Sequence, residues 1–179
     1  MRILGLYHTS EVGGGEVSFT LSLKLARDLG HEVHAVVPAE GAVFDLLARE
    51  RLPVTLLPMP SLRSPGGVVR LFRPRSDWQR LISEFRPDLL HANAVRAALY
   101  GQAIGRTTRV RTIFHARIAE PDPIADPFLM GRVDAIFGVS RIVLRRFSSC
   151  DPDRLHLLPN AVDIDAFRRP SPAVRDIRR

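Results

Sequence analysis

The sequence predicts an α/β domain built on an open, doubly wound parallel sheet with helices on both faces, a Rossmann-like arrangement. Two observations carry this prediction. Short apolar runs alternate with segments of helical periodicity along most of the 179 residues, which is the pattern of βαβ units. The runs are apolar on both faces, as expected for parallel strands that helices cover from both sides.

The first part of the chain contains three predicted strands with a helix between each consecutive pair. A strand is expected at 2–7, a helix at 15–29 that stops at Gly30, and a strand at 32–38 that stops at Pro38. The helix at 15–29 has one apolar stripe at helical spacing and further apolar residues beside it. The stripe is Val17, Leu21, Leu25 and Leu29, and beside it lie Phe19, Leu23 and Ala26. A helix at 42–51 and a strand at 53–58, bracketed by prolines, complete this part.

The second half repeats the alternation after an irregular stretch at 58–76. Helices are expected at 77–85, 95–105, 127–131 and 141–148, and strands at 87–93, 110–116, 133–140 and 154–160. A proline-rich loop at 118–127 interrupts the series. After Pro159 the alternation stops, so residues 1–160 are predicted to form the domain and residues 161–179 a hinge or linker.

Composition excludes several classes of protein. The formal charge is +7, but the only lysine is Lys24 and the arginines are scattered, so no nucleic-acid partner is expected. No stretch approaches the roughly 18 apolar residues of a membrane span. The single cysteine, Cys150, excludes an internal disulfide and a cysteine-based metal cage, and it suits a reducing compartment. A cytoplasmic location is therefore expected.

Candidate site residues follow from the predicted topology. In an open parallel sheet, ligands bind at the carboxyl ends of the strands, so polar residues directly after each strand are candidates. These residues are His8, Thr9, Gly13, Gly14, Glu40, His91, Asn93, His115, Arg117, Ser140 and Asn160.

The glycine loop between the first strand and the first helix could bind an anion. Gly13 and Gly14 leave the backbone open, and the helix behind them offers unpaired amides and a positive dipole end. The alternative is a plain turn in which Glu16 is favourably placed on the helix dipole. The loop matches neither the nicotinamide-dinucleotide fingerprint nor the Gly-x-x-x-x-Gly-Lys phosphate loop.

Two histidines, His91 and His115, end equivalent strands and are expected to point into the same crevice. Each could instead be a satisfied structural residue. A zinc site would need a third ligand such as His8, and because no closely spaced histidine pair supports it, no metal is expected.

An arginine-rich segment, Arg63–Arg86, interleaves six arginines with apolar residues. It is a candidate for peripheral contact with anionic lipid or with a lipid-phosphate acceptor. The alternative is a solvated helix face with an ordinary buried side.

Motifs from Met1 to about Phe167 resemble the N-terminal domain of retaining GT-B glycosyltransferases, the glycosyltransferase family 4-like group (glycosyl transferases group 1). The segment GGGEVSFTLSLKLARDLGHEVHAVVP resembles the first βαβ unit of that family. RPDLLHAN and VRTIFHA resemble its two histidine-bearing strands, and VDAIFGVSRIVLRRF with RLHLLPNAVDIDAF resembles the segments that lead to its second domain. Two departures are Ala161, where the family usually has glycine, and Gly15, where alanine is common.

The resemblance implies a hexosyltransferase-like enzyme that moves a sugar from a nucleotide sugar to a glycan, lipid-linked or small-molecule acceptor, without a cofactor or catalytic metal. Of the motif positions, His115 matches the catalytic histidine that contacts the transferred sugar, and Gly13 and Gly14 match the pair that approaches donor phosphate and acceptor. Positions that shape the cleft or hinge are matched by Glu16, His91, Asn93, Ser140 and Asn160.

In such enzymes the N-terminal domain chiefly binds the acceptor, and the C-terminal domain binds the nucleotide sugar. Residues 161–179 are therefore expected to lead towards an absent donor-binding domain, and this chain alone is expected to be inactive. The alternative is a non-catalytic, single-domain binding subunit that pairs with a separate donor-binding subunit.

Overall fold

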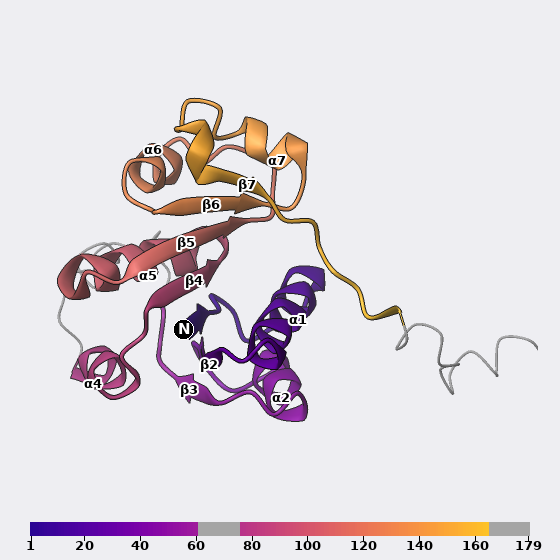
Figure 1. Ribbon diagram of the computed structural model, residues 1–179, viewed down its shortest axis with the longest axis vertical. Helices are drawn as coiled ribbons and strands as arrows, with labels where there is room; N and C mark the ends of the chain where they lie inside the picture. Colours follow the sequence, from indigo (N-terminus) through magenta and orange to yellow (C-terminus); the bar gives the residue numbers. More distant parts are fainter. Residues whose placement is uncertain (61–75, 165–179) are drawn as a thin grey trace, which may run out of the picture.

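The computed structural model describes residues 1–60 and 76–164. At its centre lies a seven-stranded sheet with the order β3-β2-β1-β4-β5-β6-β7, in which every neighbouring pair is parallel (Figure 1). The chain order reverses between β1 and β4, and ligands bind at this kind of switch point in doubly wound sheets. The predicted fold class is confirmed.

The elements agree with those expected, with shifts of a few residues at their ends. The strands are β1 (Arg2–Leu6), β2 (Glu32–Val37), β3 (Val54–Leu56), β4 (Leu89–Asn93), β5 (Arg111–Ala116), β6 (Ala135–Gly138) and β7 (Leu155–Leu157). The helices are α1 (Gly14–Asp28), α2 (Ala42–Arg49), α4 (Ser76–Phe85), α5 (Ala94–Thr108), α6 (Ala125–Met130) and α7 (Arg141–Arg145), with a 3-10 turn at Pro152–Arg154. Most of the stretch predicted to be irregular at 58–76 lies outside the described residues.

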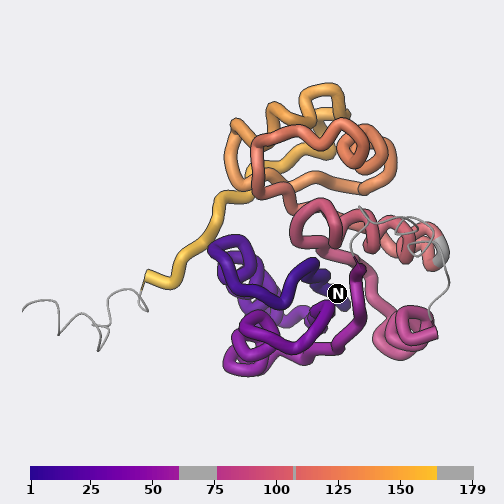
Figure 2. Tube along the Cα trace, turned by 180° about the vertical axis from the view of Figure 1, so that it is seen from behind, coloured from indigo at the N-terminus to yellow at the C-terminus, as the bar shows by residue number. Residues whose placement is uncertain are grey.

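Two apolar clusters cover the two faces of the sheet. Helices α1 and α2 lie on one side of β1–β3, and α4 and α5 lie on the other, as Figures 1 and 2 show from opposite directions. On the α1 face, Phe19 and Leu23 pack with Val33 and Val43. On the other face, α4 and α5 share a larger cluster with α6 and α7 that includes Phe114. Burial on both faces explains why the strands are apolar throughout.

The buried face of α1 differs from the apolar stripe that periodicity singles out. Val17, Leu25 and Leu29 are 41%, 60% and 69% exposed, whereas the helix buries Glu16, Ser18, Phe19, Thr20 and Leu23. Polar residues can occupy this face because they are paired there. The Thr20 hydroxyl lies 2.8 Å from the hydroxyl of Tyr7 and donates to the backbone oxygen of Glu16.

A close approach of α1 to the sheet depends on Gly5. A Cβ at this position would lie 2.5 Å from Cδ1 of Leu23, which is itself almost fully buried. Gly5→Ala is therefore expected to lower the free energy of unfolding by about 1–3 kcal/mol, because the added methyl overpacks this contact. Urea denaturation measures the change. The matched control is Gly14→Ala, whose methyl would meet nothing within 4 Å; an equal loss of stability in both variants would contradict the steric explanation.

A buried ion pair holds the loop that follows β5. Arg146 binds Asp126 through two nitrogens, with Nε 2.7 Å from Oδ2, and the two side chains are 1% and 6% exposed. Arg146 also donates to the carbonyl of Ile118, and Asp126 accepts from the amide of Asp122. The proline-rich loop after β5 is thus fastened to α6 and α7, directly beside the carboxyl end of the sheet.

Candidate functional site

The carboxyl ends of β4 and β5 meet the start of α1. Asn93 and His115 are register partners on neighbouring strands, and His91 lies next to His115 on the same face. Contacts with Glu16 on α1 and with Asn160 after β7 complete the group. The structure therefore brings together most of the residues predicted from strand ends.

One backbone amide of the glycine loop is already bonded to a side chain of α1. Gly13 is the N-cap of α1, and its amide donates to Oε2 of Glu16 over 3.1 Å. This is the plain-turn contact that the sequence left open. The first-turn amides that follow Gly13 have no intrahelical acceptor, so the anion-binding capacity of the helix start remains with them.

The two histidines form a buried stack. Their ring centroids are 5.5 Å apart with an interplanar angle of 12°, and Phe19 and Phe137 meet the rings edge-on. His91 is 8% and His115 is 1% exposed. Within residues 1–60 and 76–164, Nε2 of neither ring has a hydrogen-bond partner. A buried nitrogen without a partner is unusual in a protein interior and calls for an explanation, such as an ordered water or a ligand.

Both histidines are held neutral. Burial, with a further contribution from Arg117, lowers the pKa of His91 to about 3. Burial, Arg117 and His91 together lower the pKa of His115 to about 3, against a weaker opposing effect of the Leu158 carbonyl. Each ring therefore meets a ligand as an uncharged imidazole, which can both donate and accept a hydrogen bond.

These low pKa values predict that acid destabilises the domain. Between about pH 6.5 and pH 3 these histidines bind protons in the unfolded chain but stay unprotonated in the folded one. The free energy of unfolding therefore decreases as the pH is lowered through that window. Each histidine contributes at most about 1.4 kcal/mol per pH unit. Urea denaturation at about pH 7 and about pH 5 measures the slope. His91→Leu should flatten the slope, and an unchanged slope would contradict the assignment.

Arg117 lies at the centre of the polar group. Its Nε donates to Oδ1 of Asn93, its Nη1 donates to Oδ1 of Asn160 over 2.6 Å, and its Nη2 lies 3.5 Å from Nδ1 of His115. Burial lowers the pKa of Arg117 to about 10, so it is still a cation at neutral pH.

Asn93 connects Arg117 to the glycine loop. Its Nδ2 donates to Oε1 of Glu16 over 3.2 Å, while its Oδ1 accepts from Arg117. Although Asn93 is the N-cap residue of α5, its side chain makes no capping bond there. Asparagine often caps helices, but here the side chain bonds to Glu16 and Arg117 in the site instead of to the amides of α5.

Two further sequence candidates, Ser140 and Thr9, are engaged in local structure. The Ser140 hydroxyl accepts from the amide of Val143 and caps α7, and Thr9 accepts from the amide of Glu11 in a turn. His8 is partly buried, and burial lowers its pKa. In the part of the chain that the structure describes, no three His, Cys, Asp or Glu side chains are grouped so that they could hold a metal ion.

Gly15, which the sequence showed only as a departure from the alanine that is common in the family, lies beside Arg117 in the structure. A Cβ at Gly15 would lie 2.9 Å from Cδ of Arg117. The sequence signals were this departure from alanine and the third glycine of the triplet, which an anion-binding turn does not require.

The arginine-rich segment is described only from residue 76 onward. There α4 buries Trp78 and Leu81, and its exposed Arg80 pairs with Glu84 four residues later. The alternative of a solvated helix face with a buried side holds for this part, and residues 61–75 lie outside the described chain. None of the described helices has the length and apolar character needed to span a bilayer.

Comparisons with known proteins found one matching family model and several similar folds. The family model for Glycosyltransferase Family 4 matches residues 12–166. No curated protein matches significantly in sequence. The fold is similar to that of Anabaena HepE solved with UDP and glucose, at 19% identity and a TM-score of 0.76 over 99% of this chain and 49% of that one. It is also similar to a glycosyltransferase from Rickettsia africae ESF-5, at 16% identity and a TM-score of 0.73 over 98% and 48%.

A third similar structure is the apo form of the lipopolysaccharide outer core galactosyltransferase WaaB, at 12% identity and a TM-score of 0.70 over 92% of this chain and 47% of that one. At these identities the likeness shows the fold alone. The chain spans about half the length of these structures.

Proposed function

Since the chain belongs to Glycosyltransferase Family 4, we propose that it is the acceptor-side half of a retaining glycosyltransferase that moves a hexose from a nucleotide sugar to an acceptor. In this proposal a donor-binding half completes the cleft, either in the same polypeptide or as a separate subunit. The chain's length, about half that of the similar structures, supports its being one of two halves.

One observation carries the proposal. His115 is the second-last residue of β5, near the carboxyl edge of the sheet, is 1% exposed, and has a buried Nε2 with no partner in the described chain. A neutral imidazole in this position can hydrogen-bond a sugar hydroxyl without adding charge to the cleft. It is the kind of group that fixes the orientation of a transferred sugar.

The neighbouring residues suit an anionic donor. The start of α1 presents first-turn amides and the positive end of a helix dipole, and Arg117 adds a partly buried cation nearby. Charge that develops on a departing phosphate would be stabilised by this fixed electrostatic environment. Since HepE was solved with UDP-glucose, we propose a UDP-sugar as the first donor to test. The acceptor is left to the screen described below.

The proposal is tested by a transfer assay with radiolabelled UDP-sugars and a panel of glycan, lipid-linked and small-molecule acceptors. We expect transfer by the protein that contains both halves, and none by residues 1–179 alone, because half of the cleft is then missing. Efficient transfer by residues 1–179 alone would contradict the proposal. Activity that appears only when a separate donor-binding protein is added would establish the two-subunit alternative.

A further inference from the structure

We propose that Arg117 is a positioning residue that fastens the segment leaving the sheet after β7 to the carboxyl ends of β4 and β5, and that Gly15 leaves room for it. The fastening is a property of this chain by itself. Only its consequence for sugar transfer rests on the proposed function, because the direction of the leaving segment then sets where the donor half stands relative to His115.

The three nitrogens of the guanidinium reach three separate parts of the fold. They reach Asn93 at the end of β4, Asn160 beyond β7, and, more distantly at 3.5 Å, His115 on β5. Arginine offers a rigid planar fork of donors, so one side chain can hold these three partners in a defined mutual geometry. The neutral amides of Asn93 and Asn160 accept the two short bonds, and Glu16 is reached only through Asn93.

The leaving segment has further contacts besides that of Asn160, and Asp163 within it attracts Lys24 of α1 electrostatically. β7 has three residues, and after it the amide of Leu158 donates to Gly138 and the amide of Ala161 donates over 3.2 Å to Oγ of Ser18 on α1. Beyond that point Val162 and Ile164 are 63% and 59% exposed. Figure 1 shows the yellow end of the described chain leaving β7 and passing α1. The bonds of Asn160 and Ala161 therefore hold the first residues of this segment to Arg117 and to α1.

Gly15 makes the arginine's path possible. An added Cβ would lie 2.9 Å from Cδ and 3.4 Å from Nε of Arg117, which are atoms in the middle of the side chain rather than at its free end. The same methyl at Gly14 would meet nothing within 4 Å. A methyl group therefore fits at Gly14 but collides with Arg117 at Gly15, so alanine at the two positions gives a matched pair of variants.

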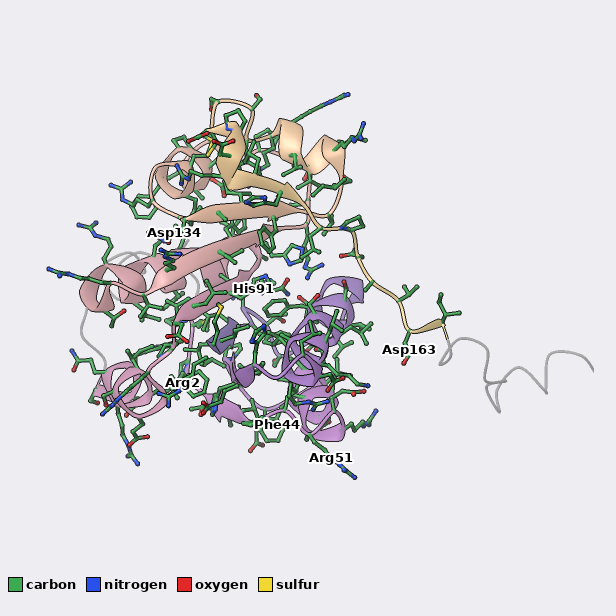
Figure 3. The ribbon with its side chains drawn as sticks, viewed as in Figure 1. Arg2, Phe44, Arg51, His91, Asp134 and Asp163 are labelled. Atoms are coloured by element: carbon green, nitrogen blue, oxygen red, sulfur yellow. The ribbon has the colours of Figure 1, made fainter. Side chains whose placement is uncertain are left out.

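Figure 3 shows side chains from α1 and from the strand ends converging close to the labelled His91. Through Arg117, Asn93 and Glu16, a chain of hydrogen bonds runs from Asn160 to the amide of Gly13. In this series of hydrogen bonds, Arg117 is the residue that bonds to Asn160 of the leaving segment.

The test is amide hydrogen exchange of residues 1–179, followed by NMR at Ala161. Arg117→Met and Gly15→Ala are each expected to speed exchange at Ala161 at least about tenfold, because the segment loses its fastening. Arg145→Met, at an exposed position of α7, and Gly14→Ala are the controls and should stay within about twofold of wild type. Protected amides in β1 and β4 report that each variant is folded.

A rescue experiment separates positioning from general stability. Asn160→Ala should speed exchange at Ala161, whereas Asn160→Asp keeps an oxygen acceptor for Arg117 and should retain protection. In the double variant Arg117→Met with Asn160→Asp, the protection should be lost again. Wild-type exchange in a folded Arg117→Met or Gly15→Ala variant would overturn the proposal. If Arg117→Met does not fold, Gly15→Ala and the Asn160 variants decide it.

Discussion

His115→Ala is expected to lower the turnover of the complete transferase by about a hundredfold or more, without unfolding the domain. The size follows from losing a preorganised hydrogen-bonding group in a site that excludes water. His115 has a nearly inaccessible ring whose Nε2 finds no partner in the described part of the chain, so the protein itself does not use this hydrogen-bonding group there. Steady-state kinetics with the donor and acceptor found in the screen give turnover, and circular dichroism reports the fold.

The matched control for this experiment is His156→Ala. His156 is an exposed histidine on β7 whose ring meets Phe137 edge-on, as His115 does from the other side. It lies outside the polar group of the site, so its loss should leave turnover unchanged. His115→Gln, which keeps a hydrogen-bonding side chain, should retain part of the activity. Turnover that is unchanged in His115→Ala would rule out a direct role for this residue.

Arg146→Met is expected to lower the free energy of unfolding by about 3–5 kcal/mol, because it leaves the buried carboxylate of Asp126 without its counter-charge. The two side chains are 1% and 6% exposed, so water cannot replace the lost partner. The same substitution removes the bond to the Ile118 carbonyl, so the loop after β5 should also loosen. Urea denaturation measures the stability, and amide exchange in residues 118–125 measures the loosening.

Arg80→Met provides the comparison, since it breaks an ion pair of similar length in a different environment. Arg80 and Glu84 are 77% and 63% exposed, and such surface pairs contribute little. No measurable change in stability is expected. If the two arginine variants lost similar stability, burial could not be the reason for the strength of the Arg146–Asp126 pair.

The fold was predictable because its signals are local. Apolar runs such as those at 32–38 and 110–116, separated by helical periodicity, are sufficient to predict a parallel, doubly wound sheet. Once that topology is assumed, the residues at the carboxyl ends of strands follow by geometry. His91, Asn93, His115 and Arg117 could therefore be named as neighbours before their contacts were known, and the structure places them together.

Local patterns did not predict which face of α1 is buried, because that depends on contacts with segments that are distant in sequence. The stripe of Val17, Leu25 and Leu29 lies outward on α1, because Thr20 and Glu16 have partners on the sheet side and can be buried. Periodicity identifies the faces of a helix but does not say which one meets the sheet when both carry apolar residues.

The sequence by itself therefore determined the class of fold, the order of its elements and the edge of the sheet at which the candidate site residues lie. Only the tertiary structure decided that Arg117 spans Asn93 and Asn160, that Gly15 makes room for it, and that Arg146 pairs with Asp126. The physical reason is that backbone periodicity depends on neighbours along the chain. A buried hydrogen bond depends instead on the register and spacing of strands and helices that are far apart in sequence.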